Sequence, residues 1–301
     1  MSMNGPSVVV LGYILLFYVF SLQMFAFAYL PESSSLQTRS RREVHIFNSY
    51  NHRVFIEDTD SFGVVYNANY PLYIERAILD APNPRIVKFK SLKYKAPARL
   101  GDNLEVLLTT NKKDPLKLNA KILKQGECTE LMSCMGIVHQ KSSCRINGER
   151  IKFEEKNYAG ESPIFTSHFV VYPDEKTHIN TFTTATVFKL FERARTNMLG
   201  GPTSLLELSL GNVHVYVARV SDYEILKDVE MNVNKNQVVV KSICKPLGSL
   251  EGGVSMVNFN QFVCNVSDMM ILSKAVVTCS CVDATTDRAA SFPSEIARKF
   301  F

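Results

Sequence analysis

Two aspartates lie in a short acidic turn just ahead of a predicted helix. Asp58 and Asp60 are separated by Thr59, and Gly63 follows shortly afterwards. A carboxylate can activate water or attack a carbonyl carbon directly, and N–H groups at a helix start can hold an oxygen that becomes anionic. Asp is also a frequent capping residue of turns and helices. The residue types alone therefore leave a catalytic and a structural role open.

Apolar spacing predicts the elements that must position this turn. Tyr70, Tyr73, Ile74 and Ala77 recur at three- and four-residue intervals, which predicts a helix over 68–79 with one buried face. Alternating and apolar runs predict a strand ahead of the helix and four behind it, at 53–56, 86–94, 104–110, 118–124 and 132–140.

The second half of the chain repeats this order of elements. A helix is predicted at 185–198, between strands at 167–172, 213–220, 230–233, 237–245, 255–264 and 275–282. Both helices contain Glu-Arg-Ala, at 75–77 and at 192–194, and Gly-Gly-Pro at 200–202 is interpreted as the stop of the second helix. The simplest account is a duplicated domain, with repeats at 44–160 and 161–301 packed as an internal dimer.

The sequence around the first helix resembles a known family. The segment reads Glu57-Asp58-Thr59-Asp60-Ser61-Phe62-Gly63-Val64-Val65-Tyr66-Asn67-Ala68-Asn69-Tyr70, and Glu75-Arg76-Ala77 follows. It is similar to the signature of the 4-hydroxybenzoyl-CoA thioesterase-like hotdog family of acyl-CoA thioesterases. That resemblance implies an α+β double hotdog, in which two antiparallel sheets each wrap a central helix and pack as a pseudo-dimer. It also implies hydrolysis of an acyl-CoA or acyl-ACP thioester.

The resemblance assigns roles to the residues of this segment. Asp60 would be the base or nucleophile, and the N–H groups of Gly63, Val64 and Val65 would form the oxyanion site. A side chain at Gly63 could block a close approach of the backbone to the ligand. Tyr66 and Asn67 complete the expected catalytic set. Many relatives have His in place of Asn67, and Asn can donate a hydrogen bond but cannot exchange a proton.

The second repeat departs from this pattern. In the second repeat, Thr177 precedes Glu192 by the same spacing at which Asp60 precedes Glu75 in the first. Thr177 cannot act as a base. Either the second repeat has lost its site and only lines the pocket used by Asp60, or an insertion gives Asp174 the role. Asp174, His178 and Asn180 resemble the Asp-x-x-x-His-Val-Asn-Asn pattern of acyl-ACP thioesterases, which makes them a possible second site.

The N-terminal segment reads as a targeting sequence. The first thirty residues contain no charged side chain, and Ala26-Phe27-Ala28 supplies a cleavage site for signal peptidase. Residues 1–28 are thus expected to be a signal peptide, or otherwise a signal anchor, followed by a transit-like linker at 29–43. The combination resembles the bipartite presequences of secondary plastids, so entry into the secretory pathway and a plastid location are expected. Membrane contact is expected only through this segment.

Composition narrows the function classes. The net charge of +5 is spread along the chain, which argues against nucleic-acid binding. The seven cysteines have no Cys-x-x-Cys spacing, and no phosphate-binding or dinucleotide motif is present, so neither a metal site nor a cofactor is expected. The partner is an acyl-CoA or acyl-ACP substrate, and the double hotdog could dimerise again. A non-catalytic acyl-binding hotdog is the alternative, while a hotdog dehydratase matches least.

Overall fold

The computed structural model of the chain describes residues 44–60, 63–81, 86–111, 114–127, 129–139, 151–158, 162–172, 175, 182–225, 237–248, 253–286, 288–294 and 297. The expected signal peptide and linker, the strand expected at 230–233, and the possible second-site residues Asp174, His178 and Asn180 lie outside these residues. Within the described part of the chain, no helix is long and apolar enough to span a lipid bilayer.

The first repeat folds as a strand, a short 3-10 helix, a long helix and four further strands. These are β1 (Val44–Arg53), η1 (Ile56–Asp58), α2 (Asn69–Leu79), β2 (Ile86–Tyr94), β3 (Asn103–Asn111), β4 (Asp114–Lys124) and β5 (Thr129–His139). The strands follow from apolar residues that recur at every second position. In β3, for example, Leu104, Val106 and Leu108 are fully buried on one face, while the residues between them are partly exposed.

The second repeat has the same order of strand, helix and four strands. Its elements are η2 (Glu155–Tyr158), β6 (Ile164–Val170), α3 (Thr184–Met198), α4 (Pro202–Leu210), β7 (Val213–Ile225), β8 (Gln237–Leu247), β9 (Met256–Asn265), β10 (Ile271–Asp283) and β11 (Arg288–Ala289). The boundary expected between residues 160 and 161 falls between β5 and β6. Helix α4 lengthens the connection from α3 to β7.

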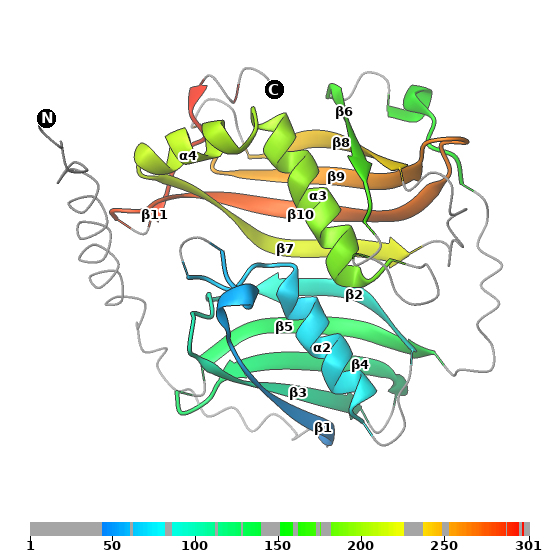
Figure 1. Cartoon of the computed structure of the whole chain (residues 1–301), viewed down its shortest axis with the longest axis vertical. Helices are drawn as coiled ribbons and strands as arrows, with labels where there is room; N and C mark the ends of the chain where they lie inside the picture. Colours follow the sequence, from blue (N-terminus) through cyan, green and yellow to red (C-terminus); the bar gives the residue numbers. More distant parts are fainter. Residues whose placement is uncertain are drawn as a thin grey trace, which may run out of the picture. The chain divides into compact units, whose positions relative to one another are not determined.

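The strands join into one antiparallel sheet. Their order is β1-β3-β4-β5-β2-β7-β10-β9-β8-β6, with β11 added to β10, so the second half mirrors the first. The two halves meet where Leu92 of β2 pairs with Val220 of β7. Figure 1 shows α2 crossing the first half of the sheet and α3 crossing the second. The predicted double hotdog is confirmed, and its two sheets are continuous through the β2–β7 pair.

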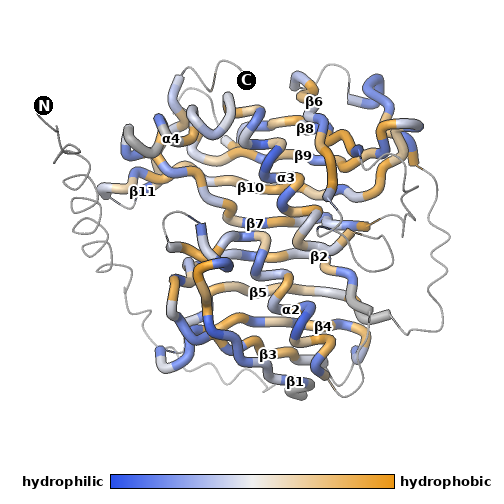
Figure 2. Tube along the Cα trace, viewed as in Figure 1, coloured by the Kyte–Doolittle hydropathy of each residue, from blue (hydrophilic) through white to orange (hydrophobic). Residues whose placement is uncertain are grey.

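Each helix buries an apolar face against its own half of the sheet. The predicted face of α2, formed by Tyr70, Tyr73, Ile74 and Ala77, is at most 2% exposed. Burial of each large side chain contributes about 1.5–3 kcal/mol, which holds the helix and the preceding turn against the sheet. Figure 2 shows hydrophobic residues along the strands of both halves behind the helices.

One predicted strand is wrong and one helix was not predicted. The strand expected at 53–56 is β1, which ends at Arg53, and Ile56 begins η1 instead. Gly200 and Gly201 do end α3, since both have a positive φ (100° and 93°). Pro202 then opens α4 rather than a loop, because proline is well tolerated in the first turn of a helix.

Candidate active site

The acidic turn closes on itself around Asp60. The Asp60 N–H donates to the Val64 carbonyl at 2.9 Å, and the Gly63 N–H donates to the Asp60 carbonyl at 3.0 Å. The Asp60 Oδ1 accepts a hydrogen bond from the Val64 N–H at 3.1 Å. Asp60 therefore does cap the turn, and the residue is exposed at the surface.

A second turn, between β2 and β3, supports the acidic turn from outside. The Leu100 N–H donates to the Gly63 carbonyl at 3.0 Å, and the Val65 N–H donates to the Ala98 carbonyl at 2.9 Å. Gly63 has a φ of 69°, a conformation that strains residues with a side chain. A Cβ at Gly63 would meet nothing within 4 Å, so the conformation, and not crowding by the protein, requires glycine there.

Asp58 has a structural role. Its side chain is buried and accepts hydrogen bonds from the Phe55 N–H at 2.9 Å and from His52 Nε2 at 3.1 Å. The Asp58 carbonyl accepts from the Tyr66 N–H at 3.0 Å and from the Asn69 side chain at 2.9 Å. Asp58 thus ties the turn to the start of α2, whereas the exposed Asp60 remains the chemical candidate.

The three amides predicted to hold an oxyanion are already engaged within the two turns. The N–H groups of Gly63, Val64 and Val65 donate to the Asp60 carbonyl, the Asp60 carboxylate and the Ala98 carbonyl, respectively. Each would have to break a hydrogen bond before it could donate to a substrate oxygen. This arrangement disfavours the role that the sequence assigned to them.

The start of α2 offers a different donor. The first N–H groups of a helix have no partner within the helix, but the Asn69 N–H donates to the Tyr66 carbonyl at 2.9 Å and Pro71 has no N–H, which leaves the Tyr70 N–H. Ala68, at the N-cap position, makes no side-chain capping hydrogen bond. The preceding segment is fixed on its other side, because the Tyr94 hydroxyl donates to the Asn67 carbonyl at 3.1 Å. The helix start is therefore positioned by its neighbours without being capped by its own side chain.

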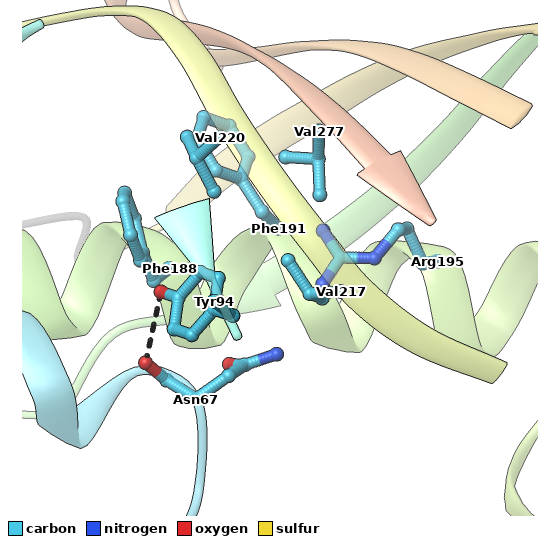
Figure 3. Close-up of a pocket in the computed structure, with 8 residues that line it drawn as sticks. All are labelled: Asn67, Tyr94, Phe188, Phe191, Arg195, Val217, Val220 and Val277. Atoms are coloured by element: carbon cyan, nitrogen blue, oxygen red, sulfur yellow. Dashed lines mark hydrogen bonds between the residues drawn. The ribbon is translucent and has the colours of Figure 1, made fainter. Parts of the chain in front are cut away.

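A pocket lies beside this helix start and is lined by both repeats. Figure 3 shows its eight lining residues, with the Tyr94–Asn67 hydrogen bond on one side and Arg195 extending toward Val217 on the other. The lining is apolar apart from Asn67, Tyr94 and Arg195, and comprises Asn67, Tyr94, Phe188, Phe191, Arg195, Val217, Val220 and Val277. Such a lining suits an apolar group with a polar end, and because the open space is no larger than a water molecule, the lining side chains would have to move apart to admit one.

Arg195 is a buried cation held by an amide network. Its Nη1 donates to Gln261 Oε1 at 2.6 Å. The Gln261 Nε2 in turn donates to the Phe191 carbonyl at 2.9 Å and to Ser242 Oγ at 3.0 Å. A buried charge is costly unless it is hydrogen-bonded, so this network fixes the guanidinium at the wall of the pocket.

Glu192, also on α3, reaches across to the first repeat. Its carboxyl is hydrogen-bonded to the Tyr66 hydroxyl and to the Asn67 side chain. Burial raises the pKa of the Glu192 carboxyl, against the opposing effect of the Arg195 guanidinium. Burial likewise raises the pKa of the Tyr66 hydroxyl, which stays neutral and able to donate. Tyr66 and Asn67, which are adjacent in sequence, thus share a hydrogen-bond partner from the other repeat.

Sequence reasoning missed Glu192, Arg195 and Tyr94 as members of the site. One signal was available: Glu192 and Arg195 share a helix with Phe188 and Phe191, and charged residues are rarely buried without a purpose. Glu-Arg-Ala was used only as the mark of the repeat. The packing of the two copies decides which face of each helix contacts the other repeat. The amino-acid sequence alone does not show this packing.

The start of α3, the equivalent place in the second repeat, is capped. Thr183 Oγ1 accepts a hydrogen bond from the Thr186 N–H at 3.0 Å. The Glu75 carboxyl, from α2, is hydrogen-bonded to both the hydroxyl and the backbone N–H of Thr184. Because these amides are occupied, the start of α3 does not reproduce the open helix start of the first repeat.

Comparison with known proteins supports the assignment made from the sequence motif. No protein-family model matches the chain. The acyl-CoA thioesterase YbgC of Helicobacter pylori, from each of two strains, is 32% identical over 123 residues, which cover 37% of this chain and 88% of the relative. A crystal structure assigned as an oleoyl thioesterase of Lactobacillus plantarum matches 80% of this chain and 97% of its own, with a TM-score of 0.51 and 10% identity. That structural likeness establishes the fold. On the sequence similarity, the chain belongs to the acyl-CoA thioesterase family of hotdog proteins.

Proposed function

We propose that this chain hydrolyses an acyl thioester of coenzyme A or of acyl carrier protein to a free acid and a thiol, with Asp60 as base or nucleophile. The observation that carries the proposal is a juxtaposition. Asp60 lies in the turn that precedes α2, the N-cap residue Ala68 gives α2 no side-chain cap, and Asn67, just before Ala68, lines a pocket formed by both repeats. The substrate class follows the family, whose Helicobacter pylori members are named acyl-CoA thioesterases.

Asp60 can serve in either of two ways. As a base, its carboxylate takes a proton from water while the water oxygen bonds to the thioester carbonyl carbon. The carbonyl electrons move onto oxygen, and their return expels the thiol sulfur, which takes up the proton. As a nucleophile, the carboxylate itself bonds to the carbon and expels the thiolate, and water then hydrolyses the resulting anhydride.

The oxyanion is placed at the start of α2 in this proposal. The amides of Gly63, Val64 and Val65 already donate within the turns, so they are poor candidates in the observed arrangement. In the first turn of α2 the Asn69 N–H donates to the Tyr66 carbonyl and Pro71 has no N–H, so the Tyr70 N–H is the donor that we assign to the oxyanion, and the helix dipole adds a partial positive charge there. Donors aimed at the developing charge typically contribute about 3–4 kcal/mol to catalysis.

The acyl group would occupy the pocket between the repeats. Phe188 and Phe191 of α3 form an apolar wall opposite Asn67, which places the reacting carbonyl near the open helix start. In this arrangement the second repeat supplies part of the binding site whether or not it has a site of its own.

The test measures the hydrolysis of a panel of aromatic and aliphatic acyl-CoA and acyl-ACP thioesters by the full chain. The Asp60→Asn variant is measured in parallel. We expect the variant to lose turnover by about two to four orders of magnitude with its circular dichroism unchanged. If the parent protein hydrolyses no thioester of the panel, the chain is an acyl-binding hotdog instead. Turnover retained in Asp60→Asn would place the reacting group elsewhere. One turnover in ¹⁸O-water separates the two roles, because only the nucleophile labels the Asp60 carboxyl.

A further inference from the structure

Each repeat contributes one glutamate to the helix start of the other repeat. One offset along the sequence relates Glu75 to Glu192 and Asn67 to Thr184, so these residues are equivalent in the two copies. Glu75 of α2 is hydrogen-bonded at the start of α3, through Thr184. Glu192 of α3 is hydrogen-bonded at the start of α2, through Tyr66 and Asn67. Each helix therefore depends on the other repeat for the environment of its N-terminus.

The two glutamates differ in the kind of hydrogen-bond donor that they bind. Glu75 accepts from the Thr184 hydroxyl and also from the Thr184 backbone N–H, so it occupies an amide of α3. Glu192 accepts from two side chains, the Tyr66 hydroxyl and the Asn67 amide group. Two side-chain donors thus hold the Glu192 carboxyl in the first repeat, whereas a backbone amide helps to hold Glu75 in the second.

We propose that Glu192 is a positioning residue of the Asp60 site: by holding the side chains of Tyr66 and Asn67, it keeps the Tyr70 N–H at the start of α2 accessible to the substrate oxygen. The inference rests on the function proposed above and makes the second repeat part of the first repeat's catalytic machinery. Without Glu192, the Asn67 side chain loses its acceptor. Asn readily bonds to backbone N–H groups near it in sequence, so a released Asn67 would compete with the substrate for them.

The burial of Glu192 supports a role beyond stability. Its Oε2 atom is buried and has no hydrogen-bond partner among the residues that the structure describes. A buried polar atom without a partner costs about 1–3 kcal/mol, so an apolar residue would stabilise this helix contact better. Arg195, one helical turn away on α3, offsets the charge and lines the pocket beside Asn67.

The test compares matched substitutions of the two glutamates in the full chain. Glu192→Ala is expected to lower kcat by roughly 10- to 100-fold with little change in KM, since the substrate still binds but meets a misplaced helix start. Glu192→Gln keeps an acceptor oxygen and should restore most of the rate. Glu75→Ala and Glu75→Gln, made as controls, should leave kcat within about twofold, because Glu75 lies at the other helix start.

A double-mutant cycle separates positioning from a general loss of structure. If Glu192 acts through Asn67, then Glu192→Ala combined with Asn67→Ala loses no more rate than the more damaging single variant. Equal kcat for the parent and Glu192→Ala, with Asp60→Asn inactive, would overturn the inference and leave the proposed hydrolysis intact. An inactive parent would instead refute the proposed function. Should Glu192→Ala not fold, Glu192→Leu, which is of similar size but has no acceptor oxygen, takes its place in the cycle with Asn67→Ala, and additive losses contradict the inference.

Discussion

The starts of α2 and α3 occupy equivalent places in two copies of one fold, yet their polar groups are arranged in opposite ways. Thr183 caps α3 with its own side chain, and Glu75 adds a hydrogen bond to the next residue's amide. At the start of α2 the Asn69 N–H donates to the Tyr66 carbonyl, Ala68 provides no side-chain cap, and Glu192 bonds to the side chains of Tyr66 and Asn67. A side-chain cap and a glutamate together stabilise the start of α3, whereas the start of α2 is left with the Tyr70 N–H as the donor that we propose for the oxyanion. The difference indicates that, in a duplicated domain, one copy can have a structural role while the other carries the proposed catalytic site.

The largest expected effect comes from filling the open helix start. Asn67→Asp is isosteric but places a carboxylate where the oxyanion would form, and removes the hydrogen bond donated to Glu192. Like charges a few Å apart repel by about 4 kcal/mol at an intermediate dielectric, so we expect kcat to fall by about 100-fold or more. Steady-state kinetics of the parent and the variant measure this change in kcat. Thr184→Asp is the matched change in α3, and an equal fall in kcat there would remove the distinction between the repeats.

A second prediction contrasts the two aspartates of the acidic turn. Asp58→Asn leaves His52 Nε2 and the Phe55 N–H with a weaker acceptor in a buried place, so we expect about 1–3 kcal/mol less stability. The kcat of the folded protein should change far less than in Asp60→Asn. Urea denaturation and kinetics on the same samples measure both quantities. A loss of rate in Asp58→Asn without a loss of stability would transfer the chemical role to Asp58.

A third prediction concerns the pH dependence of stability. Burial raises the pKa of the Glu75 carboxyl, so folding favours its protonated form. The associated stability is fully present below the usual carboxyl pKa and is lost as the pH rises through the raised value. Glu75→Gln removes this titration. Its Tm should match that of the parent in acid and exceed it increasingly toward neutral pH, as thermal denaturation would show. A constant difference at every pH would contradict the prediction.

The smallest effect is expected at the cap of the supporting repeat. Thr183→Ala removes the side chain that accepts from the Thr186 N–H, which typically costs about 1 kcal/mol of stability. Turnover per folded molecule should stay unchanged, because α3 contributes its side chains, and not its amides, to the pocket. A rise in activity would indicate that uncapping α3 opens a second site.

Much of the fold followed from local patterns. The helix at 68–79 and the strand at 86–94 were predicted within one residue of α2 and β2, because helical and alternating periodicities are strong over those lengths. The strand near residue 53 was displaced, since the charged run through Glu57 and Asp58 gave no sign that the chain had already left the sheet. Helix α4 was missed because Gly-Gly-Pro signals both the end of one helix and the start of the next.

The sequence by itself determined the family, the duplicated hotdog, and the acidic turn with Asp60, Gly63, Tyr66 and Asn67, since these depend on residues close together in the chain. Only the tertiary structure decided which partners those residues meet. Glu192 is far from Asn67 in sequence, and β2 must pair with β7 before α3 can reach the start of α2. The amides of Gly63, Val64 and Val65 are engaged within the first repeat, by Asp60 in the same turn and by Ala98 in the turn between β2 and β3. Local patterns specify secondary structure, but hydrogen-bond partners across a repeat interface follow from how the two copies are assembled.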